Sequence, residues 1–266
     1  MSTGFRFLKG HGTHNDFVVL PDPDGTVHAD LPADLVRRIC DRRGGIGGDG
    51  VLRATKTADA WFMDYRNADG SIAEMCGNGI RVFARYLVDH EGVTSPLAID
   101  TRAGRKTVIV QGDTITADLG SPEVLGETKV GAGNQSGGQS WPATHVSMGN
   151  PHAVAFVDDL GSLDLTVAPD YDQTVFPDGV NVEFVARRGE RHVAMRVYER
   201  GSGETQSCGT GACAVVVAAA LADGVGRGST YRVDVPGGTL TVTWTDDDRL
   251  LLAGPAVLVA EGNWVA

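Results

Sequence analysis

Two cysteines stand at the head of matching glycine-rich segments, Cys76-Gly-Asn-Gly79 and Cys208-Gly-Thr-Gly211. An apolar run with helical character follows each segment, which predicts that each thiol lies at the start of a helix. The two cysteines are 208 − 76 = 132 positions apart, close to half of the 266-residue chain. Two related halves could place these thiols on opposite sides of one cleft. One sulfur would then remove a proton from one face of a carbon, and the other would return a proton to the opposite face.

A helix start of this kind favours chemistry on a carboxylate. The amide groups of the first helical turn have no partners within the helix and point outward, where they can hold an anion. The same positive helix end is expected to lower a thiol pKa from about 8.5 towards neutrality. Proton removal beside a carboxylate builds up negative charge, which preorganised amide donors stabilise. We therefore expect one sulfur as thiolate and the other as thiol, with roles that exchange with reaction direction and that titrate as a pair.

Simpler interpretations of the cysteines stay open. A buried cysteine usually packs as a small apolar side chain, and this interpretation is favoured for Cys40 and Cys213. A thiol redox or zinc-binding protein is disfavoured, because no Cys-x-x-Cys pair occurs and Cys208 and Cys213 lack the histidine spacing of a structural zinc site. Four cysteines in a chain of this length also do not predict a disulfide-rich framework.

The separation of 132 positions also relates other parts of the chain. It carries Met63 onto Met195, Asn67 onto Glu199, and the segment 47–52 onto 179–184. One offset that serves three separated segments predicts the duplication of a domain of roughly 120 to 130 residues. The alternative is chance matching in a chain with 36 glycines.

Short strands are predicted for most of the chain, separated by turn dipeptides such as Asp69-Gly70 and Gly237-Gly238. The expected strands are 17–20, 107–110, 145–147, 153–157, 192–198 and 239–244, and the expected helices are 33–41, 80–89 and 212–222. Each half would be a mixed sheet around one apolar helix. A helix buried on most faces explains why the run that begins at Ala212 is apolar all round.

The same pattern predicts two domains, spanning residues 1–120 with Cys76 and residues 121–266 with Cys208. The segment 131–140, rich in Gly and Ser, has no apolar periodicity and is expected to be a flexible loop at the junction of the halves.

Composition predicts a globular protein with 42% hydrophobic and 21% charged residues. A net charge of −11 argues against a nucleic-acid partner, because phosphate binding needs a basic field. The start of the chain lacks the apolar core of a signal peptide, and the longest apolar run, Ala212–Ala222, is too short to cross a bilayer. We therefore expect a cytoplasmic protein with reduced thiols and no membrane association.

Longer motifs extend almost from end to end of the chain. They are His11-Gly-Thr-His-Asn15, Gly45-Ile-Gly-Gly-Asp49, Asn67-Ala-Asp-Gly-Ser-Ile-Ala-Glu-Met-Cys76-Gly-Asn-Gly, Met148-Gly-Asn-Pro-His152, Asn181-Val and Tyr198-Glu-Arg200-Gly-Ser-Gly-Glu-Thr-Gln-Ser-Cys208-Gly-Thr-Gly. Together these motifs closely resemble the diaminopimelate epimerase family.

The resemblance implies an α/β (mixed α+β) fold of two pseudo-symmetric domains around an active-site cleft. Each domain would be a mixed sheet or barrel around a central helix, with the strand near 257–266 returning to the first domain. It also implies a homodimer without pyridoxal phosphate, other cofactor or metal. The implied reaction acts on a small-molecule substrate and interconverts LL- and meso-diaminopimelate for lysine and peptidoglycan precursor synthesis.

Site residues follow from the matching motifs. Cys76 and Cys208 would be the two acid/bases of the reaction. The helix-end residues Gly77, Asn78, Gly209 and Thr210 would hold the reacting carboxylate. The set Asn15, Asn67, Asn150, Asn181 and Arg200 would hold the distal amino-acid end, with Arg200 as a planar fork for its carboxylate. His152 and Glu199 would form a polar pair beside the reacting amino group.

Other roles for these residues are also open. An Asn beside Gly or Pro is usually a turn residue. His152 could be a packing residue without a role in binding, and Glu199-Arg200 could be a surface pair. Gly50 departs from the family, many members of which carry Gln there. The rival functions are a proline or hydroxyproline racemase, which needs no distal Asn set, and an amino-acid-binding protein, which needs no pair of sulfurs.

Overall fold

The computed structural model describes residues 4–28, 30–132 and 139–265. Within these residues the chain forms eighteen strands and three helices, α1 (Ala33–Cys40), α2 (Gly77–Glu91) and α3 (Gly209–Ala222). All three predicted helices are present, and α2 and α3 each begin three residues before the predicted start. The reason is that the apolar periodicity marks where side chains become buried, whereas each helix already begins at the glycine that follows its cysteine.

The chain divides into two compact units. Unit 1 comprises Met1–Ala117 and Gly254–Ala266, and unit 2 comprises Asp118–Ala253. The strands numbered from unit 1 are β1 (Phe5–Gly12), β2 (Asn15–Pro21), β3 (Gly50–Lys56), β4 (Trp61–Asn67), β5 (Leu97–Thr101), β6 (Gly104–Gln111), β7 (Thr114–Asp118) and β18 (Val257–Trp264). Those numbered from unit 2 are β8 (Glu123–Gly131), β9 (Ser140–Ser147), β10 (Pro151–Phe156), β11 (Asp170–Tyr171), β12 (Asn181–Gly189), β13 (His192–Glu199), β14 (Gly203–Thr205), β15 (Ser229–Val235), β16 (Gly238–Trp244) and β17 (Leu250–Pro255).

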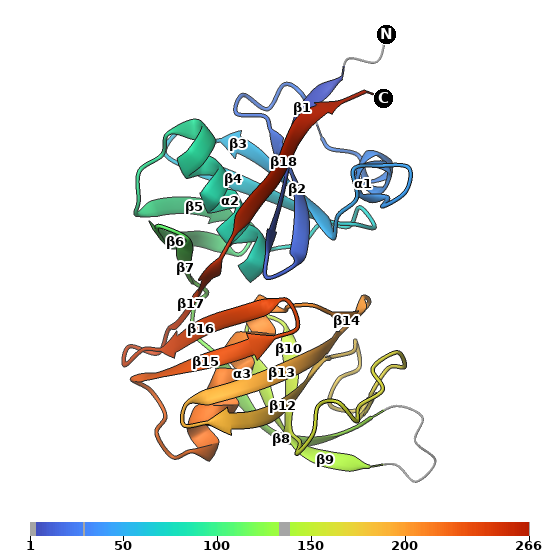
Figure 1. Cartoon of the computed structure of the whole chain (residues 1–266), viewed down its shortest axis with the longest axis vertical. Helices are drawn as coiled ribbons and strands as arrows, with labels where there is room; N and C mark the ends of the chain where they lie inside the picture. The colour runs from blue at the N-terminus through green and yellow to red at the C-terminus, as the bar shows by residue number, and fades with distance from the viewer. Residues whose placement is uncertain (1–3, 29, 133–138, 266) are drawn as a thin grey trace. The chain divides into compact units, whose positions relative to one another are not determined.

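The two units repeat one sheet topology. In unit 1 the strands pair in the order β18-β1-β2-β3-β4-β5-β6-β7, with β2/β3 and β4/β5 parallel and the other pairs antiparallel. In unit 2 the order is β8-β9-β10-β12-β13-β15-β16-β17, with β10/β12 and β13/β15 parallel and the other pairs antiparallel. The C-terminal strand β18 lies beside β1 (Figure 1). The fold class expected from the sequence, two pseudo-symmetric mixed α/β halves, is confirmed.

Strand register shows which positions of the two units are equivalent. Met63 and Met195 differ by 132, but their cross-strand partners Ala54 and Val185 differ by 185 − 54 = 131. The offset between β3 and β12 is therefore one residue shorter than the sequence comparison predicts. The same offset relates β2 to β10 through their parallel partners. Phe17 of β2 pairs with Gly50 of β3, His152 of β10 pairs with Asn181 of β12, and Gly50 and Asn181 are equivalent because 181 − 50 = 131. Phe17 is thus equivalent to His152.

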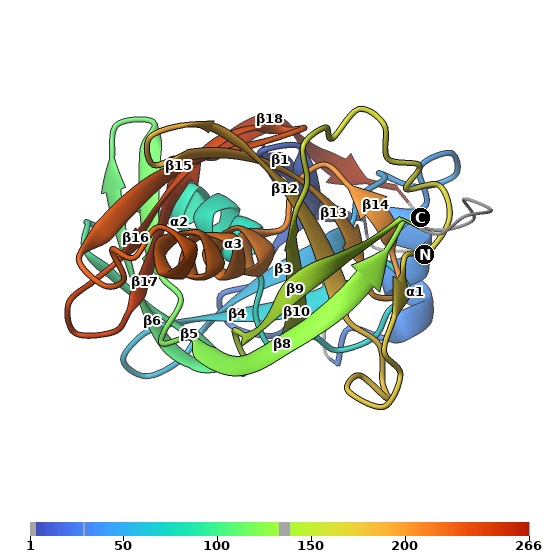
Figure 2. The same ribbon diagram turned by 90° about the horizontal axis from the view of Figure 1, so that it is seen from below.

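A helix lies against one face of the sheet in each unit. In unit 2, α3 contacts β9, β10, β12, β15 and β16, which surround it in the view of Figure 2. Eleven of its 14 residues are buried, which confirms the physical reason given for its uniformly apolar sequence. In unit 1, α2 packs on one face of the sheet, and Val36, Ile39 and Cys40 of α1 pack against Val18 and Val51 on the other.

The segment 131–140 does not lie at the junction of the halves. It connects β8 and β9, which pair with each other and belong to unit 2, so this expectation was wrong. Repetition of the strand pattern shows why: β8 is the first strand of the second half, so the halves divide before it. Residues 133–138 of the segment lie outside the described residues.

Candidate active site

Cys76 is the residue that caps the N-terminus of α2. Its backbone is extended, with φ −140° and ψ 125°, and its sulfur accepts a hydrogen bond from the amide of Gly79 at 3.4 Å. The sulfur therefore takes the place that a serine or aspartate oxygen occupies in an ordinary N-cap. This geometry places Sγ at the positive end of the helix.

Cys208 caps α3 in the same manner. Its φ is −118° and its ψ is 116°, and its sulfur accepts from the amide of Gly211 at 3.4 Å. A side chain on either third-position glycine would crowd the turn. A Cβ on Gly79 would lie 3.2 Å from Leu52, and one on Gly211 would lie 2.6 Å from Oε1 of Glu183. The glycines thus permit the close approach that the sequence predicts.

In unit 1, Asn15 lies against the Cys76 turn. Its Oδ1 accepts from Nδ2 of Asn78 at 3.1 Å and lies 3.7 Å from the sulfur of Cys76. Its Nδ2 donates to Oδ2 of Asp49 at 2.7 Å. Because a carboxylate only accepts, Asp49 fixes the amide with its oxygen directed at the cysteine turn.

Asp49 belongs to a charged network on the ends of β1 and β2. Arg42 bridges Asp16 and Asp49 at 2.6 and 2.7 Å, and Lys9 contacts Asp16 at 2.5 Å. Burial of Asp16 opposes its ionisation, but hydrogen bonds from Arg42 and Lys9 outweigh that effect and lower the pKa of its carboxyl. Asp16 therefore stays ionised and anchors both cations beside Asp49.

Asn67 ends β4 with both sides of its amide engaged. Its Oδ1 accepts from the hydroxyl of Tyr65 at 2.8 Å, and its Nδ2 donates to Oγ of Ser71 at 3.0 Å. Its neighbour across the ladder is Gly50, where a Cβ would lie 2.6 Å from the carbonyl oxygen of Arg66. Position 50 is therefore closed to any side chain in this backbone arrangement, which gives a physical reason for the glycine there.

In unit 2, Asn150 is the counterpart of Asn15. Its Nδ2 donates to Oγ1 of Thr210 at 3.5 Å, and Oγ1 lies 3.5 Å from the sulfur of Cys208. The amide oxygen of Asn150 lies 3.1 Å from Nε2 of His152, whose Nδ1 lies 2.6 Å from Oε1 of Glu183. His152 and Glu183 are both completely buried. A continuous series of polar contacts thus leads from Glu183 to the sulfur.

The expected lowering of the thiol pKa is wrong for Cys208. Burial raises its pKa well above the ordinary value, and the carboxylates of Glu199 and Glu183 raise it further. Hydrogen bonds from Thr210 and from the amide of Gly211 act in the opposite direction but do not outweigh burial. Position at a helix N-terminus is therefore not enough to ionise this thiol, whose side chain is almost fully enclosed.

Glu199, Asn181 and Arg200 come together where β12 begins and β13 ends. Oδ1 of Asn181 accepts from the backbone amide of Arg200 at 2.9 Å, so the amide side chain holds the turn that presents the guanidinium. Arg200 lines a small pocket of about 110 Å³ together with Tyr171 and Tyr198. Glu199 accepts a hydrogen bond from the hydroxyl of Thr205.

Cys40 and Cys213 are buried, as the packing interpretation requires. Burial raises the pKa of Cys40 to about 11. Cys213 is the counterpart of Arg81, since 213 − 81 = 132. Arg81 is fully buried in α2 and donates to the carbonyl oxygen of Gly77 at 3.0 Å. A positive charge therefore lies within the helix of unit 1 where unit 2 has a thiol.

Sequence reasoning missed Glu183, Asp49 and Arg81. The signal for Glu183 is a single acidic residue in the otherwise apolar run 182–186. The contact with His152 arises from the parallel pairing of β10 with β12, which places both side chains on one face of the sheet. A lone acidic residue in an apolar stretch of a buried strand is therefore the pattern that would have found it.

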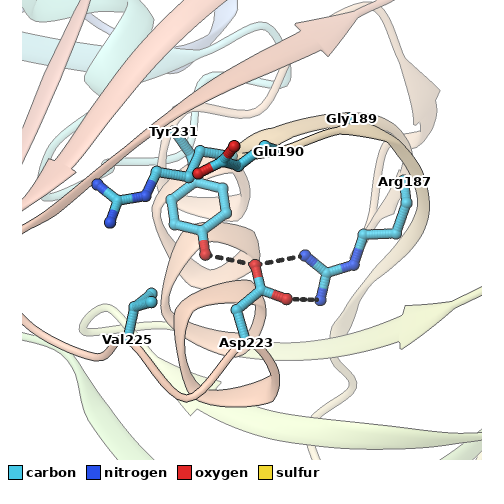
Figure 3. Close-up of a pocket in the computed structure, with 7 residues that line it drawn as sticks. Arg187, Gly189, Glu190, Asp223, Val225 and Tyr231 are labelled. Atoms are coloured by element: carbon cyan, nitrogen blue, oxygen red, sulfur yellow. Dashed lines mark hydrogen bonds and ion pairs between the residues drawn. The ribbon is translucent and has the colours of Figure 1, made fainter.

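A larger pocket of unit 2, about 510 Å³ in volume, contains neither cysteine (Figure 3). Asp223, one of its lining residues, accepts from the hydroxyl of Tyr231 at 2.6 Å and pairs with Arg187 at 2.8 Å. Burial and the hydrogen bond to Asp223 raise the pKa of Tyr231 to about 12. Asp223, Arg187 and Tyr231 are thus engaged with one another.

Two general features of the described residues bear on the class of site. No three His, Cys, Asp or Glu side chains among them gather in a way that could hold a metal ion. In the same part of the chain, none of the helices has the length and apolar character needed to traverse a membrane.

Solved structures share this duplicated fold, although their sequences differ widely. A phenazine biosynthesis protein of the PhzF family from Bacillus anthracis has a TM-score of 0.71 at 16% identity, covering 99% of this chain and 100% of that chain. A hydroxyproline epimerase from Agrobacterium vitis has a TM-score of 0.69 at 16% identity, covering 98% of this chain and 92% of that chain. At these identities the likeness defines the fold class alone.

Sequence comparison places the chain more closely. The family model described as Diaminopimelate epimerase matches residues 7–125 and 144–259. The chain is 53% identical to the diaminopimelate epimerase of Streptomyces coelicolor, covering 99% of this chain and 96% of the relative. It is 46% identical to that of Thermobifida fusca, covering 97% of each. The chain belongs to the diaminopimelate epimerase family, and the resemblance seen in its motifs is confirmed.

Proposed function

We propose that the protein interconverts LL-2,6-diaminopimelate and meso-diaminopimelate by a two-base mechanism that needs no cofactor or metal. Membership of the diaminopimelate epimerase family supports the substrate and the reaction. The single structural observation that carries the mechanism is the duplicated N-cap, in which Cys76 and Cys208 each present sulfur at the start of a helix.

In the proposed reaction one sulfur acts as a thiolate and removes the proton from the reacting α-carbon, becoming a thiol. The other sulfur begins as a thiol and gives its proton to the opposite face of the same carbon, becoming a thiolate. The net charge of the protein is unchanged. Helix-end groups at Gly77, Asn78, Gly209 and Thr210 hold the carboxylate and stabilise the charge that develops on it.

The surroundings of the two sulfurs support a division of labour in the substrate-free protein. Arg81 brings a positive charge to the helix that Cys76 caps, whereas burial and two carboxylates raise the pKa of Cys208. We assign Cys208 as the resting thiol and Cys76 as the resting base. Reaction in the opposite direction starts from the exchanged protonation states.

The proposed binding roles follow the motifs. Asn15 and Asn150 each contact a cysteine turn and belong to the set proposed to hold the distal end of the substrate. Asn67, Asn181 and Arg200 complete this set, with Arg200 pairing with the distal carboxylate. Glu199 is the proposed partner of the reacting ammonium group. The homodimer and the cytoplasmic location stay predictions from the sequence.

The deciding experiment is proton exchange in D2O. LL-Diaminopimelate incubated with the protein is expected to take up deuterium at one α-carbon and to yield the meso isomer. Proline, run in parallel, is expected to take up none. Exchange with proline alone would favour an imino-acid racemase, and exchange with neither substrate would remove the enzymatic proposal.

A further inference from the structure

Glu183 has no contact with the substrate in the mechanism above, yet it is one of the most enclosed polar groups of unit 2. Its side chain and that of His152 are both 0% exposed, and Oε1 lies 2.6 Å from Nδ1. The same oxygen would lie 2.6 Å from a Cβ on Gly211, so the carboxyl group packs directly against the first turn of α3. Among the described residues, its other oxygen has no hydrogen-bond partner.

The equivalent place in unit 1 is apolar. Strand register makes Phe17 the counterpart of His152 and, with 183 − 52 = 131, Leu52 the counterpart of Glu183. Both apolar residues are completely buried and lie near the corresponding glycine, Gly79. An apolar pair therefore suffices for this fold. A buried acid–base pair of similar size adds a desolvation cost, so stability does not explain its presence in unit 2.

The contacts around His152 define the direction of each hydrogen bond. Since the amide oxygen of Asn150 only accepts, Nε2 of His152 carries a proton and donates to it. One further proton is shared between Nδ1 and Glu183, so the pair is neutral overall whichever of the two holds it. Asn150 then turns its NH2 group to Oγ1 of Thr210, which leaves the hydroxyl hydrogen for the sulfur of Cys208.

We propose that Glu183 is a positioning residue for the reaction at Cys208: by holding His152 with Nε2–H directed at Asn150, it leaves the Thr210 hydroxyl to donate to the sulfur. When Cys208 gives its proton to the substrate carbon, a thiolate remains in a buried site. The hydroxyl of Thr210 and the amide of Gly211 are the donors placed to receive that charge. This inference deepens the proposed function, and its kinetic test rests on it.

The first test needs no activity. Protein labelled with 15N-histidine is examined by multiple-bond 1H–15N spectra, and His152 is assigned by the signal lost in His152→Gln. The proton of Nε2 is expected in the wild type. Glu183→Leu leaves Nδ1 without its partner, so the ring and the Asn150 amide are expected to turn over, and the proton of Nε2 is expected to be lost or exchanged with Nδ1. A wild-type ring whose Nε2 lacks a proton would overturn the proposal, as would a tautomer unchanged in Glu183→Leu.

The second test is a double-mutant cycle on the rate of epimerisation. Glu183→Leu, which copies the residue found in unit 1, is expected to lower kcat about 10- to 100-fold with little change in KM. Combined with Thr210→Val, it is expected to cost no more than the worse single variant, because both act through one hydroxyl group. If the kcat losses of the two single variants multiply in the double variant, Glu183 has a merely structural role and the proposal is overturned.

Two further variants complete the design. Glu183→Gln can donate to Nδ1 and keep the proton on Nε2, so it is expected to retain more activity than Glu183→Leu. Equal loss in both would count against the proposal. Asp22→Asn, which removes a buried carboxylate bonded to Arg53 at 2.8 Å in unit 1, is the control and is expected to leave kcat unchanged. An inactive wild type would refute the proposed function, while the tautomer experiment would still decide the inference.

Discussion

The two units give the same backbone turn to two cysteines and surround it with different side chains. Beneath the Cys76 turn lie Phe17 and Leu52, and Arg81 brings a buried positive charge to the same helix. Beneath the Cys208 turn the equivalent positions hold His152 and Glu183. The two turns thus share the geometry of the sulfur, while the charges around it differ. A symmetric scaffold can in this way supply two groups of one type with unequal proton affinity.

The largest expected effect is on the rate of epimerisation, and it is the same for a change in either half. Cys76→Ala and Cys208→Ala are each expected to lower the rate of epimerisation by about 10²- to 10⁴-fold, the usual contribution of a general acid or base. The measurement is turnover of LL-diaminopimelate, with circular dichroism to verify the fold. Near-normal turnover in either variant would show that the reaction does not need both sulfurs.

The second prediction separates the halves by pH. Since burial and two carboxylates raise the pKa of Cys208, its thiolate fraction at any pH below that pKa is smaller than that of an ordinary thiol. Alkylation by iodoacetamide, followed for each cysteine by peptide mass spectrometry, is expected to be about tenfold or more slower at Cys208 than at Cys76 near pH 8. Glu199→Gln removes one of the two charges and is expected to shift the Cys208 profile to lower pH. A profile that stays in place would mean that Glu199 does not act on this sulfur.

The matched glycines offer a comparison of stability. Gly79→Ala requires a shift of a few tenths of an ångström from Leu52, whereas Gly211→Ala must displace the carboxyl group of Glu183. We expect Gly211→Ala to lower the free energy of unfolding by about 1–3 kcal/mol and Gly79→Ala by less. Thermal or urea unfolding measures both. The reverse order would show that unit 2 has more free space at this turn than unit 1.

The smallest effect concerns Asp49, which orients Asn15 in unit 1. Asp49→Asn allows the Asn15 amide to turn its NH2 group towards Cys76, where it would donate to the thiolate and make that base weaker. The expected fall in kcat is about tenfold or less, as for one hydrogen bond to a charged group. Because the Asp49 side chain is exposed, the loss is expected to be smaller than that of Glu183→Leu. The control is Asp100→Asn, which breaks an exposed ion pair with Arg105. Equal losses of kcat in Asp49→Asn and Asp100→Asn would show that Asp49 does not act by orienting Asn15.

Local patterns were enough to predict the helices, the repeat and the cysteine caps. Apolar runs after Cys76 and Cys208 report burial along one element, and glycine spacing reports the turn that precedes it. Glu183 could not be assigned a partner in this way, because His152 is distant in sequence and meets it only through the pairing of β10 with β12. The direction of the Cys208 pKa was likewise beyond a local pattern, since it depends on burial and on carboxylates from β12 and β13.

The contribution of β18 to unit 1 has a consequence for biosynthesis. On the ribosome, the strands of unit 2 emerge in one uninterrupted stretch, and β8 can pair with β9 as soon as β9 has been made. In contrast, all of unit 2 separates β1 from its partner β18 in the sequence, so nascent unit 1 carries an unpaired edge until unit 2 and then β18 have been made. The half that bears Cys76 is therefore the later of the two to mature and the more exposed to aggregation while the polypeptide is being made.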